Sequence, residues 1–394
     1  MEVEEAVMRI LAGLTAMFMG CAGWAAPVEQ GEPNVPEFSP AFEGQTRAEA
    51  LAPTAIQVSV FARGLEHPWG IAALPGGGYL VTERPGRMRI VGEDGRVSAP
   101  IEGLPEVAAR QQGGLLDVAL SPGFERDRRV YWTYAKPVRG GRVTAAARGV
   151  LSQDGTRMSE IEEIFEQAPP RRNGLHFGSR ILFGPEGHVF ITVGERFSAR
   201  ARVLAQDLGA TYGKVVRLWP DGRVPEDNPY GSAVWSYGHR NPQGAAVRPG
   251  DGALLTIEHG PAGGDELNRI EKGANYGWPV ISYGENYDGS PVGEGRTQAA
   301  GMEQPLYYWD PVIAPSGMAF YDGELFADWR GDLLIASLNP GGLVRLRLQG
   351  DRVVGEERMI EGDHRIRDVE VAPDGAVLLL VDAPKGGIFR LVPR

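Results

Sequence analysis

Cysteine is almost absent from this chain: its 394 residues contain one, Cys21. A single thiol excludes an internal disulfide framework and a zinc site built from several cysteines. Basic charge is also in deficit, since 40 Lys and Arg stand against 51 Asp and Glu and give a formal net charge of −11. Nucleic acids and anionic membranes both attract basic surfaces. We therefore expect no nucleic acid and no anionic membrane as the main partner.

The chain also lacks a comfortable membrane span. The uncharged run "ILAGLTAMFMGCAGWAA" near the N-terminus is somewhat short of the roughly 20 residues that a span needs. Residues 1–26 are interpreted as a secretory signal peptide or a lipoprotein signal, with the true start at Met8. Cleavage after Ala25 and a lipid anchor at Cys21 are the two alternatives, and an ordinary N-terminal helix is disfavoured by the proline-rich stretch that follows. The protein is expected to be exported, to the periplasm or the cell surface.

Long helical patterns are scarce. Residues 27–54 are rich in proline and glutamate without apolar periodicity, which predicts a disordered tether. From residue 55 onward, short apolar or β-branched runs are separated by Gly, Pro and Asp. This pattern is typical of an all-β protein.

The apolar runs repeat one plan six times: a strand, a turn bearing Pro, Asp or Gly, and a second strand. The copies are "GIAALPGGGYLVTE", "LLDVALSPGFERDRRVYWTY", "SRILFGPEGHVFITVGE", "GAAVRPGDGALLTIEH", "GMAFYDGELFADWRGDLLIAS" and "DVEVAPDGAVLLLVD". Their spacing of about 45 to 75 residues fits one four-stranded blade each. The sequence therefore predicts a six-bladed β-propeller of four-stranded antiparallel blades over residues 55–394. Its ring is expected to close by pairing residues 56–62 with 386–392.

Several loops beside these strands collect polar residues: "QQGGLLD", "NGLHFGSR", "SYGHRNPQG", "EHGPAGGDELN", "GANYGWP" and "HRIRD". Loops of a propeller build the mouth of its channel, so all of these segments are candidates for one site. Any one of them alone is as well explained by turn glycines and polar caps. Taken together they favour a site, because a solvated turn does not need a His, an Arg-Asn pair and an Arg-x-Arg on separate blades.

In these loops the chain resembles the soluble aldose sugar dehydrogenases that depend on pyrroloquinoline quinone (PQQ). The motifs "QGGLLDV", "HFG-R", "WSYGHRNPQG", "EHGP-GGDE", "NYGWP", "SGMAFY" and "RIRDV" occur in the order found in that family and cover nearly all of residues 56–394. The resemblance implies a six-bladed propeller that holds PQQ and calcium. It also implies oxidation of the C1 hydroxyl of an aldose sugar to a lactone.

Catalytic roles follow from the same resemblance. The histidine of "HFG", His176, corresponds to the general base that takes the proton of the anomeric hydroxyl while hydride leaves C1 for C5 of the quinone. Imidazole suits this task because its ordinary pKa of about 6.5 lies near neutral pH. Arg240 of "HRNP" corresponds to a guanidinium that stabilises negative charge at the quinone carbonyl. Without the resemblance, a lone histidine before a strand is more often a structural residue.

Cofactor contacts are implied at a set of polar positions in the same loops, and forked guanidinium donors suit the three carboxylates of PQQ. Surface salt bridges are the alternative explanation for two of them, the arginines of "HRIRD". The implied cofactor-binding residues are Gln112, Arg240, Asn241, Tyr287, Ala314, Asn339, Arg365 and Arg367.

A calcium site is implied at the Gly-rich "HGPAGGDE" loop, since calcium prefers oxygen ligands that include backbone carbonyls and carboxylates. The backbone oxygens of Gly260 and Pro261 correspond to ligands of the ion that bridges to PQQ. Glu266 and Tyr276 fall on other metal-associated positions, and Asp265 is a further candidate. An ordinary surface turn is the alternative explanation for the acids.

Three departures from the family pattern bear on affinity and substrate. The glucose enzymes carry an aspartate directly before the catalytic histidine, and Leu175 stands there in this chain. Asn339 falls where a family lysine lies near the cofactor, and Ala314 where some members have a threonine. These differences leave PQQ affinity and sugar preference open.

Electrons are expected to pass from PQQ to a separate acceptor, a cytochrome, quinone or dye. Two other functions are compatible with the sequence. One is a calcium-dependent propeller lactonase or other hydrolase, which would not need Arg365 and Arg367 to hold a tricarboxylate. The other is a non-catalytic propeller that binds sugar or protein.

Overall fold

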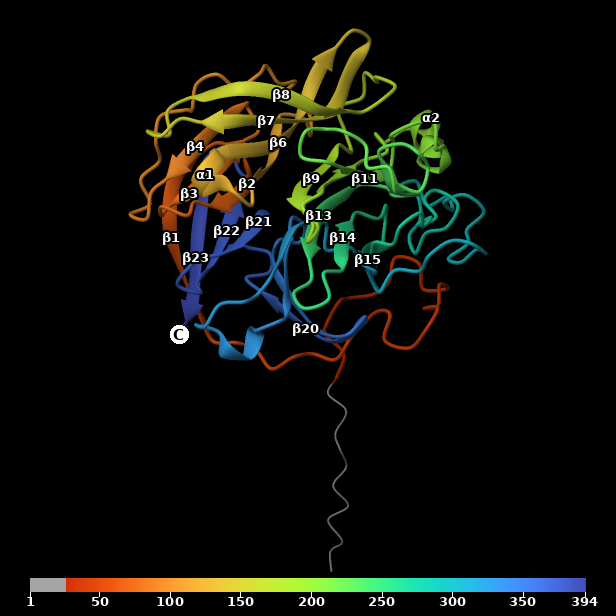
Figure 1. Ribbon diagram of the computed structural model, residues 1–394. Coiled ribbons are helices and arrows are strands. Elements are labelled where there is room, and N and C mark those ends of the chain that lie inside the picture. The colour runs from red at the N-terminus through yellow and green to blue at the C-terminus, as the bar shows by residue number, and fades with distance from the viewer. Residues whose placement is uncertain (1–25) are drawn as a thin grey trace, which may run out of the picture.

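The computed structural model describes residues 26–394 as a ring of six antiparallel sheets (Figure 1). The expectations for a signal peptide and for Cys21 concern residues 1–25, which lie outside the described part. The prediction of a six-bladed β-propeller is confirmed. None of the helices in residues 26–394 has the length and apolar character that a membrane span requires.

The first three blades follow one another along the chain. Blade 1 contains β2 (Pro68–Ala73), β3 (Tyr79–Glu83) and β4 (Arg87–Val91). Blade 2 contains β5 (Leu115–Leu120), β6 (Arg129–Val138), β7 (Gly141–Leu151) and β8 (Met158–Glu166). Blade 3 contains β9 (Gly178–Phe183), β10 (Val189–Val193), β11 (Lys214–Leu218) and β12 (Val234–Tyr237).

The other three blades complete the ring. Blade 4 contains β13 (Pro242–Val247), β14 (Leu254–Glu258), β15 (Asp265–Arg269) and β16 (Tyr307–Trp309). Blade 5 contains β17 (Pro315–Phe320), β18 (Leu333–Ser337), β19 (Gly342–Gln349) and β20 (Arg352–Met359). Blade 6 contains β21 (Ile366–Val371), β22 (Val377–Val381), β23 (Gly386–Pro393) and β1 (Ile56–Leu65). Short helices lie in the connections: α1 (Phe124–Asp127), α2 (Ala199–Arg202), η1 (Val203–Gln206) and η2 (Ala327–Trp329).

Blade 1 is the exception to the four-stranded plan, because its sheet has three strands. The fourth position is occupied by residues 97–101, which follow β4 with irregular pairing. Val97 forms an isolated bridge with Val91, and the backbone N–H of Ile101 donates to the carbonyl of Met88 at 2.9 Å. An extended chain therefore covers the outer edge of this blade without completing a ladder.

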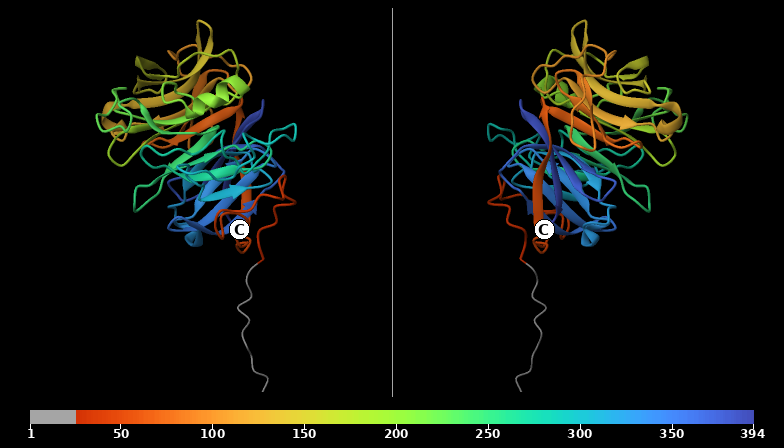
Figure 2. Two further views of the ribbon diagram at one scale, coloured as in Figure 1. Left: turned by 90° about the vertical axis from the view of Figure 1, so that its right-hand side faces the viewer. Right: turned by 90° about the vertical axis from the view of Figure 1, so that its left-hand side faces the viewer.

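The ring closes between the two ends of the propeller. β1 pairs antiparallel with β23, from Ile56 opposite Pro393 to Leu65 opposite Gly386, as the sequence predicts. Apolar side chains of successive blades interlock between the sheets, as Leu255 and Ile257 of blade 4 do with Leu333 and Ile335 of blade 5. Closure and interlocking make residues 55–394 one packed unit (Figure 2).

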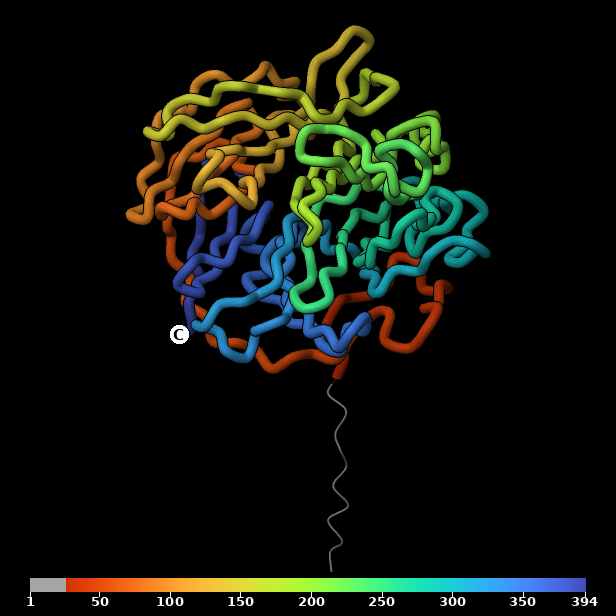
Figure 3. Tube along the Cα trace, viewed as in Figure 1, coloured from red at the N-terminus to blue at the C-terminus, as the bar shows by residue number. Residues whose placement is uncertain are grey.

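Residues 27–54 pack along the propeller, where we expected a disordered tether, and that prediction is wrong. Figure 3 shows this segment, in red, running along the blue part of the ring. The backbone N–H groups of Asn34 and Val35 donate to the carboxylate of Asp310 at 2.9 and 3.0 Å, and Gln45 is fully buried. The segment is held by hydrogen bonds to groups of the folded propeller, and such bonds leave no apolar periodicity in its sequence.

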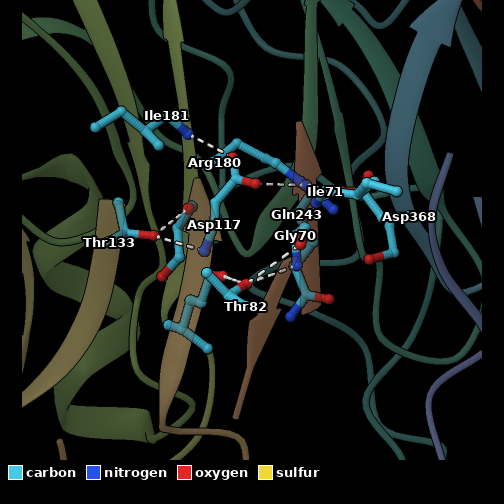
Figure 4. A network of polar contacts seen from close by, with 12 residues as sticks. Gly70, Ile71, Thr82, Asp117, Thr133, Arg180, Ile181, Gln243 and Asp368 are labelled. Atoms are coloured by element: carbon cyan, nitrogen blue, oxygen red, sulfur yellow. Dashed lines mark hydrogen bonds and ion pairs between the residues drawn. The ribbon is translucent and has the colours of Figure 1, made fainter. Parts of the chain in front are cut away.

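An ion network joins the inner strands below the channel mouth (Figure 4). Arg180 of β9 donates from Nη1 to Asp117 of β5 at 2.8 Å and to Asp368 of β21 at 2.9 Å. Its Nε donates to the backbone carbonyl of Gln243 in β13 at 2.6 Å. One buried guanidinium thus links four blades and fixes Gln243, whose side chain faces the candidate site described below.

The channel also contains Glu370, which lies on the same face of β21 as Asp368 because side chains alternate along a strand. Burial and the neighbouring Asp368 raise the pKa of Glu370 to about 8. A raised carboxyl pKa stabilises the fold at low pH, and this stability is lost as the pH rises through about 8. At pH 9 we expect the Glu370→Gln variant to have a free energy of unfolding about 2 kcal/mol higher than that of the unaltered protein, and therefore to unfold at a higher temperature. At pH 4 the two proteins are expected to melt alike; an equal difference at both values would contradict the assignment.

Candidate active site

A cavity of about 180 Å³ opens at the mouth of the channel, and loops or strand ends of all six blades contribute to it. The cavity has no aspartate or glutamate in its lining, although the protein as a whole carries a net charge of −11. Four arginines face it. The lining residues are Trp69, Arg84, Gln112, His176, Arg240, Asn241, Gln243, His259, Tyr287, Ala314, Leu338, Arg365 and Arg367. Such a lining favours an anionic ligand.

Most of the residues implied as catalytic or cofactor-binding therefore meet in one place. The structure brings together Gln112, His176, Arg240, Asn241, Tyr287, Ala314, Arg365 and Arg367. Asn339 is not among them: its side chain is exposed, and the preceding Leu338 lines the cavity instead. The asparagine that stands here in place of the family's lysine is therefore not part of the cavity lining.

The backbone and the ring of His176 are both fixed by contacts with neighbouring residues. It adopts a left-handed backbone with φ of 48°, which is uncommon for a residue with a side chain. Its N–H donates to Oε1 of Gln112 at 2.8 Å, and its carbonyl passes so close to Gly194 that a Cβ there would lie 2.2 Å away. The ring packs edge-on against Phe197, with 4.9 Å between centroids. A strained residue fixed in this way is typical of a functional site.

The ring of His176 forms a hydrogen bond with a buried acid. Its Nδ1 lies 2.7 Å from Oε1 of Glu195, which follows the end of β10. A carboxylate at this position holds the ring proton on Nδ1 and leaves the lone pair of Nε2 free to accept a proton. Leu175 stands where the glucose enzymes have an aspartate next to the histidine. In this chain Glu195, distant in sequence, is the acid that contacts the ring.

Burial and nearby cations set the charge of this pair. Burial, and then the positive charge of Arg240, lower the pKa of His176 well below its ordinary value, so the imidazole is neutral at pH 7. Burial raises the pKa of Glu195 to about 7, against the pull of Arg240 and Arg202. The pair can therefore act as a base at and above neutral pH.

Arg240 crosses the site between two loops of blade 4. Its Nη1 donates to the carbonyl of His259 at 2.8 Å and its Nη2 to the hydroxyl of Tyr287 at 3.3 Å. Its backbone N–H donates to Glu258 at 2.5 Å. The Nε of Arg240 is buried without a hydrogen-bond partner in the described chain, and such an atom is costly unless a ligand accepts from it.

The two arginines of "HRIRD" lie at the start of β21 and both face the cavity. Arg367 is buried and donates to Asp382 at 2.6 Å and to the side chain of Gln243 at 2.8 Å. Arg365 is more exposed and donates to the carbonyl of Leu338 at 3.1 Å. The Nε atoms of Arg367 and of Arg84 are buried and have no partner within residues 26–394. A ligand with several carboxylates fits these unpaired donors.

A much smaller hollow of about 10 Å³ adjoins the cavity and includes three of the implied metal positions: Gly260, Glu266 and Tyr276. Burial and the adjacent Glu258 raise the pKa of Glu266 well above its ordinary value. Asn268, whose side-chain amide contacts Glu258 and Glu266, has a buried Oδ1 without a hydrogen-bond donor in the described chain. These oxygens are of the type that calcium prefers.

The other implied metal ligands have different contacts. Asp265 accepts backbone N–H groups of Gly260 at 2.8 Å, Ile313 at 2.8 Å and Ala314 at 2.7 Å, so its carboxylate joins two loops. Tyr276 stacks on His239 and donates its hydroxyl to the carbonyl of Arg269. Pro261 does not line the hollow. Residues 26–394 contain no cluster of three or more His, Cys, Asp or Glu arranged for a metal, so a calcium ion here needs backbone carbonyls.

Sequence reasoning did not assign several residues of the site. Glu195 is the most important of them, and its signal was an acid directly after a buried strand, in "VGERF". Gln243 and His259 stood inside the quoted motifs "NPQG" and "EHGP" without a role. Trp69, Arg84 and Leu338 had no local signal, because only the closed ring brings them to the mouth.

A sequence model of the glucose/sorbosone dehydrogenase family matches residues 65–390 of this chain. The chain belongs to that family. The resemblance inferred from its loops is thereby confirmed.

Several relatives match this chain in sequence or structure over most of its length. It is 40% identical over 353 residues to aldose sugar dehydrogenase YliI of Escherichia coli (strain K12), which covers 87% of this chain and 94% of the relative. A solved glucose dehydrogenase superposes with a TM-score of 0.82 at 47% identity, over 85% of this chain and 99% of the other. The PQQ-bound form of an aldose sugar dehydrogenase from Streptomyces coelicolor superposes with a TM-score of 0.72 at 30% identity, over 87% and 99%.

Proposed function

We propose that this member of the glucose/sorbosone dehydrogenase family is a PQQ- and calcium-dependent aldose dehydrogenase that oxidises the C1 hydroxyl of sugars to lactones. The observation that carries the proposal is a cavity whose lining contains His176, backed by Glu195, together with four arginines and no acidic side chain. A base beside a cationic pocket is what removal of a proton next to an anionic cofactor requires. The PQQ-bound form of the Streptomyces relative supports the choice of cofactor.

PQQ fits the residues present. Arg365, Arg367 and Arg84 offer guanidinium donors to its carboxylates, and the unpartnered Nε atoms of Arg84 and Arg367 would gain acceptors. When bound, the cofactor supplies a quinone carbon that accepts hydride. Calcium would be held by the oxygens of the small hollow around Glu266 and by backbone carbonyls of the Gly260 loop.

The chain's own residues perform the proton chemistry. His176 accepts the proton of the C1 hydroxyl at Nε2, while Glu195 holds the Nδ1 proton and balances the charge that forms on the ring. Arg240 places its guanidinium next to the site, where a fixed positive charge stabilises developing negative charge. Gln112 keeps His176 in position through the bond to its backbone.

A hydrolase is the competing enzyme class, and one constellation has the order of its triad. Ser236 Oγ lies 2.8 Å from His239 Nε2, and His239 Nδ1 lies 2.9 Å from Glu258 Oε1. Ser236 and His239 are both fully buried, so no substrate carbonyl can reach the hydroxyl. Ser236 therefore cannot act as the nucleophile of a serine hydrolase.

The proposal is tested by loading the purified protein with PQQ and calcium and following dye reduction with several aldoses. We expect reduction that requires sugar and PQQ and that falls when a chelator removes calcium. Broad use of aldoses is expected, because Tyr287 at the cavity is 66% exposed and leaves the mouth open. PQQ binding without turnover of any sugar would instead support a non-catalytic binding propeller.

Replacing Arg365 with glutamine is expected to weaken PQQ binding about tenfold, the effect of one lost charge-assisted hydrogen bond. The change should spare folding, since the Arg365 side chain is 54% exposed and makes only one hydrogen bond in the described chain, to the carbonyl of Leu338, and a long ion pair of 4.0 Å with Asp382. A fluorescence titration with PQQ measures the effect. Arg358→Gln, in blade 5, is the control that removes one arginine outside the cavity. Equal PQQ affinity in the Arg365 and Arg358 variants would contradict the assignment.

The cellular setting is also proposed. We infer export of the protein by its N-terminal segment, to the periplasm or the cell surface. Electrons leave the site for a separate acceptor.

A further inference from the structure

A second hollow in the described chain is distinct from the cofactor cavity. It has a volume of about 850 Å³ and lies between blades 6 and 1. Its wall includes Arg63, Leu65, Arg87, Arg89, Lys385 and Phe389, and we call it the blade 6/1 groove. A hollow of this volume matches a small-molecule site.

Charge in the groove is opposite in sign to that of the whole protein. Four cations line it against one acid, Glu66. Arg87 and Arg89 bind the buried carboxylate of Glu83 at 2.8 and 3.0 Å. The side chains of Arg63 and Lys385 form no hydrogen bond or ion pair with residues 26–394 and remain available to a ligand. Unpaired cations on an acidic protein attract anions.

The groove also presents apolar surface. Leu65 and Val381 form its buried side, and the ring of Phe389 packs against His364 with 4.8 Å between centroids. Apolar and aromatic walls with a few charged groups suit a flat aromatic anion better than a fully hydrated inorganic one.

A wall that includes residues of blade 6 lies between the groove and the cofactor cavity. Asp382 stands in this wall and accepts from Arg367 at 2.6 Å and from His67 at 2.8 Å. Its neighbours Val381 and Ala383 line the groove, whereas Arg367 lines the cavity. Both hollows are lined by residues at the start of β21: His364 lines the groove, and Arg365 and Arg367 line the cavity.

We propose that the blade 6/1 groove binds a small anionic quinone-type electron acceptor next to the cofactor cavity. This inference rests on the proposed dehydrogenase function. Oxidation of an aldose at C1 releases two electrons and two protons. A quinone takes up both pairs to become a hydroquinone while the aldose becomes a lactone, so the reaction balances without another reactant.

Binding of anthraquinone-2-sulfonate to the PQQ-loaded protein tests the site without turnover. Arg63→Glu combined with Lys385→Glu should raise the Kd about tenfold or more. The control combines Arg157→Glu and Arg223→Glu, which reverse two exposed cations in other blades and change the net charge equally. The control should bind as the unaltered protein does. Equal Kd values in all three proteins, or a probe that PQQ displaces, would overturn the proposal.

Acceptor kinetics provide the second arm of the test. In the groove variant the KM for anionic dichlorophenolindophenol should rise about tenfold, while the KM for cationic N-methylphenazonium should not rise and the sugar KM should not change. An equal rise for both dyes would overturn the proposal. If the unaltered protein reduces neither dye with any aldose, the proposed function fails, and the binding titration still decides whether the groove takes an aromatic anion.

Discussion

His176→Ala is expected to lower kcat by about 10² to 10⁴, the usual contribution of a positioned general base. PQQ binding should survive, because the arginines that face the cavity are not altered. The KM for sugar should change little, since the lost interaction is made as the proton moves. The measurement is the steady-state rate of the PQQ-loaded variant, together with a PQQ titration that shows equal loading.

The control for this variant is His188→Ala. His188 is also buried and packs against Trp219 in blade 3, away from the cavity lining. The His188→Ala variant should have a lower free energy of unfolding but nearly the same kcat as the unaltered protein. A His176 variant with a rate within threefold of the unaltered protein would show that another group takes the proton.

Glu195→Gln is expected to lower kcat by about 10² or more. The amide of glutamine can donate to Nδ1 of His176, which places the ring proton on Nε2 and removes the lone pair that the reaction uses. The shape of the side chain is kept, so the protein should fold and load PQQ normally.

The pH profile distinguishes this positioning role from simple destabilisation. Burial raises the pKa of Glu195 to about 7, and a protonated Glu195 no longer keeps the proton on Nδ1. In the unaltered protein kcat should therefore rise with pH through about 7. The variant should lose this rise, and an unchanged profile would contradict the role assigned to Glu195.

The fold could be predicted from the sequence because a propeller repeats. Each copy shows two apolar strands around a Pro or Asp-Gly turn, and six copies define six blades. Blade 1 departs at its edge, where residues 97–101 follow β4 with only one isolated bridge. Such an edge is set by a few backbone hydrogen bonds, which leave no periodic pattern.

The candidate site was predictable where a motif stands beside a strand. His176, Arg240 and Arg367 each lie within a few residues of an inner strand, and ring closure carries them to one mouth. Glu195 belongs to none of the motifs. It follows the C-terminal end of β10 and is brought to His176 only when β9 and β10 pair. Asn339 was assigned to the cofactor by alignment of a motif, and the structure turns its neighbour Leu338 toward the cavity instead.

The N-terminal segment shows a different limit. Its proline and glutamate content predicts disorder, yet Gln45 is fully buried against blade 4. Polar contacts of this kind depend on the surface that the propeller presents. They cannot be inferred from the composition of the segment alone.

A single-turnover experiment tests the central claim most directly. The PQQ-loaded protein is mixed without oxygen or dye with one equivalent of glucose, and the absorbance of oxidised PQQ is followed while the lactone is measured. The account predicts that this absorbance is lost, that one equivalent of lactone forms per bound PQQ, and that His176→Ala slows the change by about 10² or more. Loss of absorbance at the same rate in the variant, or no loss with any aldose in the unaltered protein, would contradict it.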